Sequence, residues 1–294
     1  MSRRSLRLLP VLVLALFGLL AGASAARAAK CPNLVIVLDR SGSMTSAPDG
    51  GFASPPNRRW DIAVDAVKAI AKEYNNLLPI GLSMFAPDGG CGGGKLDVAP
   101  DYDTESKILA ALAAAQPDSA TPTGETIVNM AKEPALRDPS RGQYMILITD
   151  GEPNCSAGEP TFTVNALKAA YAQSPSITTF VVGFGALPAD AANTMDQMAE
   201  AGGKPIMNAA RKFYVAEDAN SLKRALADIF KIIVGAEVAM GCDDTCYSNG
   251  CADPAQQCIR GVCKVNPCAG VICGPGRYCY TDGVSAGTCV AACT

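Results

Sequence analysis

Three short polar segments of this chain carry hydroxyl and carboxylate groups that could hold a metal ion. The first is an Asp-Arg-Ser-Gly-Ser run at positions 39–43, directly after the apolar run 34–38. The second is a Thr-Pro-Thr-Gly run at 121–124, and the third is an aspartate that closes another apolar run. All offer oxygen, which Mg²⁺ prefers while keeping positions open for water or substrate. We therefore predict one divalent-cation site made by Asp39, Ser41, Ser43, Thr121 and Asp150.

The types and order of these residues resemble the von Willebrand factor A (vWA) domain family with a complete metal-ion-dependent adhesion site. The third segment reads Thr-Asp-Gly-Glu at 149–152, as at the end of a later strand in that family. The resemblance covers residues 33–235, and the alternative is that Asp39 caps a helix while the serines satisfy loop backbone. It implies that the serines and Thr121 bind Mg²⁺, or Mn²⁺ or Ca²⁺, directly and that the aspartates often act through water. One position would stay open for a carboxylate of the ligand.

Composition limits the classes of function. The chain has 294 residues, of which 49% are hydrophobic, so one domain of about 200 residues with a smaller appendage is expected. A net charge of −3 gives no basic surface for nucleic acid. Because histidine is absent, Ser-His-Asp and Cys-His catalysis are excluded. We expect a protein that is not an enzyme, and keep a Mg²⁺-dependent hydrolase as the less favoured alternative.

The segment 1–29 is expected to be an export signal. Arginines at positions 3, 4 and 7 form a basic start, and the apolar stretch Leu8–Leu20 is too short to span a bilayer comfortably. Ala-x-Ala cleavage motifs follow at 23–25 and 26–28. We expect no transmembrane anchor in the mature chain. The style of the signal is bacterial, which predicts export to the extracellular space or cell surface, or to the periplasm.

Strand-like and helix-like segments alternate along the chain, which predicts an α/β fold with a doubly wound, mostly parallel sheet. Continuous apolar runs indicate buried parallel strands, and apolar residues at positions such as 63, 67, 70 and 74 indicate a helical face. The expected strands are Leu34–Leu38, Ile80–Phe85, Leu96–Val98 (short, at an edge), Tyr144–Thr149, Ile177–Phe184 and Lys212–Val215. The expected helices are Trp60–Tyr74, Glu105–Ala115, Gly124–Lys132, Thr161–Ala172, Pro188–Ala201 and one striped from Leu222 to Ile233.

This fold predicts where the candidate ligands meet. Open α/β sheets bind ligands at the carboxyl ends of their strands, where the strand order reverses. Asp39 follows the first expected strand and Asp150 ends the fourth, and the resemblance implies that these strands are central neighbours. Glu152 is either a supporting residue of the site or an ordinary exposed glutamate. The loops 45–57 and 87–95 should form the rim of the site and set specificity, unless they are tolerated insertions.

The thirteen cysteines divide between the expected domain and a tail. Ten lie in the last 53 residues and include two similar sets of four, at 246, 251, 258 and 263 and at 268, 273, 279 and 289. Units this small need disulfides to be stable, and the exported context favours disulfides over zinc. We therefore expect three parts, which are a signal peptide at 1–29, a vWA-like domain at 31–241 and a cysteine-rich tail at 242–294.

Five cysteines lie outside these repeats. In this fold both ends of the domain should emerge on the face opposite the cation, so Cys31 can pair with Cys242. Cys91 and Cys155 follow strands whose tips lie on the cation face, so they can pair there. Cys293 is left as either a free thiol or an intermolecular disulfide.

These expectations combine into an exported, divalent-cation-dependent adhesion protein that recognises an acidic group on another protein or on a surface polymer. A second hypothesis is a structural assembly protein whose cysteine-rich tail does the binding. From the sequence we expect Asp39→Ala or Asp150→Ala to abolish cation binding without unfolding the domain. Either change could even stabilise the cation-free protein, because two nearby carboxylates repel each other.

Overall fold

The computed structural model describes residues 30–238, apart from residues 76, 86, 88, 89 and 119, together with parts of the segment 250–291. The predicted export signal and the cysteines at 242, 246 and 293 lie outside the described residues. Within the described part of the chain, no helix has both the length and the apolar character needed to cross a bilayer.

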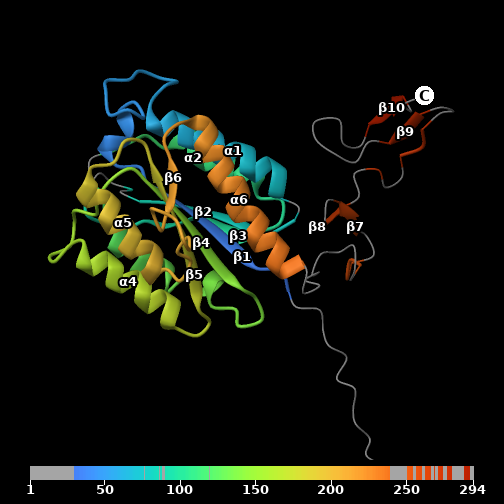
Figure 1. Ribbon diagram of the computed structural model, residues 1–294. Coiled ribbons are helices and arrows are strands. Elements are labelled where there is room, and N and C mark those ends of the chain that lie inside the picture. Colours follow the sequence, from blue (N-terminus) through green and yellow to red (C-terminus); the bar gives the residue numbers. More distant parts are fainter. Residues whose placement is uncertain are drawn as a thin grey trace, which may run out of the picture.

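A six-stranded sheet organises the domain (Figure 1). Its strands, in spatial order, are β3 (Lys95–Asp101), β2 (Ile80–Met84), β1 (Asn33–Leu38), β4 (Gln143–Thr149), β5 (Ile177–Phe184) and β6 (Tyr214–Ala216). Neighbouring strands are parallel, except that the edge strand β3 runs antiparallel to β2. The predicted α/β class is therefore confirmed. The strand order reverses between β1 and β4, which is where a ligand site is expected in such a sheet.

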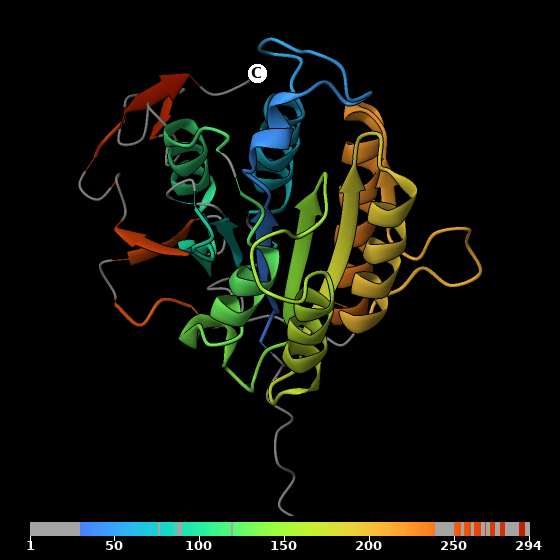
Figure 2. The ribbon, with the colours of Figure 1, turned by 90° about the vertical axis from the view of Figure 1, so that its left-hand side faces the viewer.

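Helices cover both faces of this sheet (Figures 1 and 2). One face carries α1 (Arg59–Tyr74), α2 (Glu105–Ala114) and α6 (Ala219–Val238), and the other carries α3 (Thr123–Met130), α4 (Thr161–Ala172) and α5 (Ala189–Ala201). Successive residues of a strand point to opposite faces, so Ile36 enters the core beneath α1 and α6 while Val35 and Val37 enter the other core. Burial on both faces explains the continuous apolar runs of the central strands.

The predicted strands and helices form with small shifts at their ends. β3 extends beyond the predicted Leu96–Val98 because an edge strand tolerates polar residues, and Asp97 accepts a hydrogen bond from Met84 N at 2.8 Å. α1 starts at Arg59 because the Asp61 carboxylate caps it, accepting from Arg58 N at 3.2 Å. Two short 3₁₀ helices were not predicted, η1 (Gly42–Thr45) and η2 (Pro134–Leu136).

The described part of the cysteine-rich segment contains two antiparallel hairpins. They are formed by β7 (Gln256–Ile259) with β8 (Val262–Val265) and by β9 (Arg277–Cys279) with β10 (Cys289–Ala291). The third and fourth cysteines of each predicted repeat face each other across a hairpin. Disulfides join Cys251 to Cys263, Cys268 to Cys279 and Cys273 to Cys289. The second cysteine bonds the fourth in both repeats, so these six cysteines form disulfides rather than zinc sites.

Candidate metal centre at the carboxyl ends of the strands

The two aspartates of the predicted site meet where β1 and β4 end side by side. Asp39 directly follows β1, and Asp150 directly follows β4. Asp39 N donates to Ile148 O at 2.9 Å, so the pairing of the two strands continues one residue beyond β1. The strand tips in Figure 2 mark this edge, above which the loop between β1 and α1 projects. The order of the strands therefore brings two carboxylates from distant parts of the chain to one place.

A chain of hydrogen bonds joins both serines to Asp150. Ser43 Oγ donates to Asp150 Oδ1 at 2.7 Å, and the hydroxyl oxygens of Ser41 and Ser43 are 2.9 Å apart. The 3₁₀ helix η1 fixes the two serines, because Met44 N donates to Ser41 O at 3.1 Å and the Met44 side chain is fully buried. Ser41 and Asp150 are buried, whereas Ser43 is exposed. The cluster therefore reaches solvent at Ser43.

Asp39 lies completely buried and is held from two sides. Its Oδ1 accepts the backbone N–H of Ser41 at 2.7 Å, and its Oδ2 accepts the hydroxyl of Thr149 at 2.6 Å. Burial, and after it the negative charge of Asp150, raises the pKa of Asp39 to about 7 despite these hydrogen bonds. A nearby cation would stabilise the charged form of this carboxyl group. Thr149 was not among the predicted site residues, although it precedes Asp150 in the Thr-Asp-Gly-Glu run.

The loop that carries Thr121 is attached to both halves of the site. Asp118 N donates to Arg40 O at 2.7 Å, which ties the loop to the Asp-x-Ser-x-Ser segment. Thr121 N donates to Asn154 Oδ1 at 3.0 Å, and Asn154 N donates to Thr121 O at 3.3 Å, which ties it to the loop after β4. The structure therefore brings Thr121 to the same edge of the sheet as the other four predicted residues.

The donor set at this edge fits a hard divalent cation. It offers carboxylate and hydroxyl oxygens, which suit Mg²⁺, Mn²⁺ and Ca²⁺. Groups of three or more His, Cys, Asp or Glu side chains that could hold a metal are absent from the described residues, so a cation here would depend on serine and threonine hydroxyls. The hydroxyl of Thr123, the first residue of α3 after the Thr121 loop, is buried with no hydrogen-bond partner, which fits a polar ligand near this loop.

A buried arginine lies against the site and was not predicted from the sequence. Arg59 Nη1 donates to Asp150 Oδ2 at 2.6 Å, and the side chains of Arg59 and Asp150 are 6% and 0% exposed. Asp150 therefore uses one oxygen for Ser43 and the other for Arg59. Arginine in the first turn of a helix is usually exposed, so only the fold reveals this contact.

The Glu152 side chain contacts helix α5. Its Oε1 accepts a hydrogen bond from Thr194 Oγ1 of α5 at 3.1 Å, and the residue is exposed. The sequence left Glu152 as either a supporting residue of the site or an ordinary exposed glutamate, and the structure favours the exposed glutamate.

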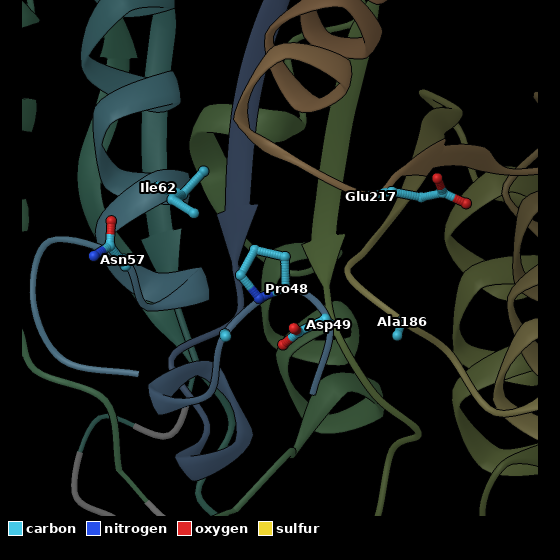
Figure 3. A pocket seen from close by; sticks show the side chains of 7 residues that line it. Pro48, Asp49, Asn57, Ile62, Ala186 and Glu217 are labelled. Atoms are coloured by element: carbon cyan, nitrogen blue, oxygen red, sulfur yellow. The ribbon is translucent and has the colours of Figure 1, made fainter. Parts of the chain in front are cut away.

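The loop 45–57 is bonded to its neighbours and forms one side of the rim. Pro48 O accepts from Ala186 N, in the loop after β5, at 2.7 Å. Figure 3 shows the cavity of about 530 Å³ beside this contact. The residues that line it are Ala47, Pro48, Asp49, Asn57, Ile62, Ala186 and Glu217. The cavity therefore lies between the loop 45–57 and the loop after β5.

Two described residues of the loop 87–95, Cys91 and Gly94, are held by neighbouring elements. Cys91 and Cys155 form the expected bond between this loop and the loop after β4. Gly94 N donates to Thr126 Oγ1 of α3 at 2.8 Å. Cys31 is also disulfide-bonded, and its predicted partner Cys242 lies outside the described residues.

Removal of the rim disulfide should destabilise the domain. The bond joins residues separated by 64 positions, so Cys91→Ala/Cys155→Ala is expected to lower the free energy of unfolding by about 3–5 kcal/mol through loop entropy. Urea denaturation of the oxidised proteins would measure this change. The matched control is Cys251→Ala/Cys263→Ala in the tail, which should leave the main unfolding transition in place. Equal midpoints for the rim variant and wild type would contradict the prediction.

Solved structures share this fold at low sequence identity. A variant of the PilB minor pilin from Streptococcus sanguinis aligns with a TM-score of 0.56 and 14% identity, covering 74% of this chain and 64% of that one. A von Willebrand factor type A protein from Catenulispora acidiphila aligns with a TM-score of 0.52 and 17% identity, and the alignment covers 70% of this chain and 43% of that one. The pilus adhesin SpaC from Lactobacillus rhamnosus GG, in its open conformation, aligns with a TM-score of 0.51 and 17% identity. This alignment covers 70% of this chain and 30% of that one. The alignments therefore span less than two thirds of each of these longer proteins.

A match of the sequence to a known family shows which family this chain belongs to. No curated protein matches the chain. Residues 33–229 match the family described as von Willebrand factor type A domain, and this match includes every residue of the candidate metal centre. On that match, and with the sheet order and site geometry described above, the chain belongs to the von Willebrand factor type A domain family.

Proposed function

We propose that this chain is a divalent-cation-dependent adhesion protein that recognises an acidic group on another protein or on a surface polymer. The observation that carries the proposal is the oxygen cluster in which Ser43, exposed to solvent, bonds Ser41 and the buried Asp150. Membership of the vWA family supports it, as does the shared fold of SpaC, which is described as a pilus adhesin.

Each residue of the cluster has a distinct part in this proposal. Bound Mg²⁺, Mn²⁺ or Ca²⁺ supplies a local positive charge and an open position that a carboxylate can fill. Ser41, Ser43 and Thr121 would hold the cation, with Asp39 and Asp150 behind them. The exposed position of Ser43 leaves the centre open to a partner. Both carboxylates are engaged by protein donors, which favours binding over general-base catalysis.

We also infer that the chain acts outside the cytoplasm. The disulfide Cys91–Cys155 and the three described tail disulfides would form and persist in an oxidising compartment. In this proposal residues 1–29 are the export signal, residues 31–241 the binding domain and residues 242–294 the cysteine-rich tail. Cys293 could link the chain to a partner if it is not a free thiol.

The tail supports a second candidate function. Its two hairpins carry equivalent disulfides, so the tail presents two small units of one kind. Repeated units of this kind could join chains to one another or to a matrix. In such a structural assembly protein, the metal centre would only stiffen the rim of the domain.

Thr121→Ala separates the two candidates. It removes one neutral hydroxyl and leaves the charge of the site unchanged, so the adhesion proposal expects loss of cation-dependent binding in a folded protein. The measurement is binding of the full chain to cell surfaces with Mn²⁺ and with EDTA. Wild type should bind only with Mn²⁺, and Thr121→Ala should bind in neither condition.

The matched control is Thr161→Ala, an exposed threonine at the start of α4, which should bind like wild type. Binding that survives both EDTA and Thr121→Ala would refute the adhesion proposal and favour assembly through the tail.

A further inference from the structure

The Arg59 side chain is held in one position beside the metal centre. Its Nη2 donates to Pro48 O at 3.3 Å and to Ala186 O at 3.5 Å, while Nη1 bonds Asp150. Gly185 has a φ of +90°, and a Cβ at this position would lie 2.5 Å from Arg59 Nε. The guanidinium therefore rests against a backbone that only glycine can provide, and it has little freedom to leave Asp150.

This fixed charge changes the electrostatics of the site. Asp150 is fully buried as a side chain, and a buried carboxylate without a partner strongly destabilises a fold. Arg59 supplies that partner from within the chain, so the cation-free site is already partly neutralised. The same guanidinium would repel a divalent cation held by the neighbouring serines, because like charges interact strongly where water is excluded.

The adjacent Arg58 pairs with a different carboxylate, so the pairing with Asp150 is specific to Arg59. Arg58 pairs with Asp61 of its own helix at 2.7 Å, and both side chains are 17% exposed. Arg59 instead reaches across the fold to Asp150 and to carbonyl groups of the loop 45–57 and of the loop after β5. Lysine could keep the charge of Arg59 but could not make several planar, fork-like contacts at once.

We propose that Arg59 is a resident counter-ion of the cation site, which stabilises the cation-free protein and weakens cation binding. The inference rests on the proposed function, because it assumes that the cluster holds a divalent cation. In this inference the positive charge of Arg59 competes with the cation, so it sets the cation concentration that is needed before a partner can bind.

The test uses the full chain and Mn²⁺ alone as the probe. Arg59→Gln removes the charge, Arg59→Lys keeps it, and Arg58→Gln removes a matched charge that pairs elsewhere. Calorimetric titration with Mn²⁺ should show Arg59→Gln binding on the order of tenfold tighter than wild type. Arg59→Lys and Arg58→Gln should bind within about threefold of wild type, because each leaves a positive charge at position 59.

Stability gives a second readout in case Arg59→Gln folds poorly without cation. The variant would be purified with Mn²⁺, and its melting temperature compared with Mn²⁺ and after EDTA. The rise produced by Mn²⁺ should be larger in Arg59→Gln than in wild type, because the cation replaces the missing charge. An equal rise would overturn the inference and leave Arg59 as a structural tether.

The remaining outcomes separate this inference from the proposed function. If wild type binds Mn²⁺ and Arg59→Gln binds it equally or more weakly, only the counter-ion role is overturned. If Arg59→Lys tightens binding as much as Arg59→Gln, geometry rather than charge is responsible and the inference also falls. If no variant and no wild-type protein binds Mn²⁺, the proposed function fails and the inference fails with it.

Discussion

Asp150→Ala is expected to lower the free energy of unfolding of the cation-free protein by about 3–5 kcal/mol, because it leaves the buried guanidinium of Arg59 without its partner. Urea denaturation in EDTA would measure the loss. The control is Asp61→Ala, which removes the more exposed partner of Arg58 and a helix cap, and should cost about 1 kcal/mol.

This expectation reverses the one drawn from the sequence alone. With two carboxylates and no known counter-ion, removal of Asp150 was expected to leave the domain folded and even to stabilise it. The contact with Arg59 changes the sign, because the substitution now strands a buried charge instead of relieving a repulsion.

A double variant tests this cause directly. Asp150→Ala/Arg59→Met removes both charges, so it should recover most of the stability that Asp150→Ala loses. Wild-type stability in Asp150→Ala, or no recovery in the double variant, would show that the ion pair does not set the stability of this edge.

Asp39→Asn is expected to stabilise the cation-free protein, whereas Asp150→Ala destabilises it. Asp39→Asn should also remove cation binding. Asparagine keeps the size of Asp39, and its amide can still accept from Ser41 N–H and donate to the Thr149 hydroxyl. It also removes a buried charge, so the cation-free variant should be more stable than wild type at pH 8, on the order of 2 kcal/mol. Mn²⁺ binding should fall below detection by calorimetry.

The dependence on pH follows from the raised pKa of Asp39, about 7 in the folded protein against an ordinary value of 3.8. Between these two values the folded protein holds a proton that the unfolded chain has released. The contribution of Asp39 to stability is therefore fully present below about pH 4 and is lost as the pH rises through 7. Asp39→Asn should remove this loss of stability with rising pH.

The measurement is urea denaturation in EDTA at pH 5 and pH 8. Wild type should lose stability between these values relative to Asp39→Asn. The same pH slope in both proteins would contradict the assignment of this titration to Asp39, and wild-type Mn²⁺ affinity in the variant would remove Asp39 from the proposed site.

The sequence by itself determined the fold class, and its resemblance to the vWA family implied that the two aspartates meet. Apolar runs as continuous as Leu34–Leu38 must be buried on both faces, and their alternation with helices permits few arrangements other than a doubly wound sheet. Once β1 and β4 are central neighbours, Asp39 and Asp150 lie together because parallel strands end at the same edge. The Cys91–Cys155 disulfide followed from the same reasoning.

Only the tertiary structure decided the charge balance of the site. Arg59 gives no signal in sequence, because arginine at the start of a helix is usually solvated. Its burial depends on Asp150, Pro48 and Gly185, which come from three separate loops and approach it only after the sheet has formed. Electrostatic energies depend on distance and on exclusion of water, and neither is encoded in local spacing. The residue types therefore predicted a cation site, and the packing around Arg59 decided that Asp150→Ala should destabilise the protein rather than stabilise it.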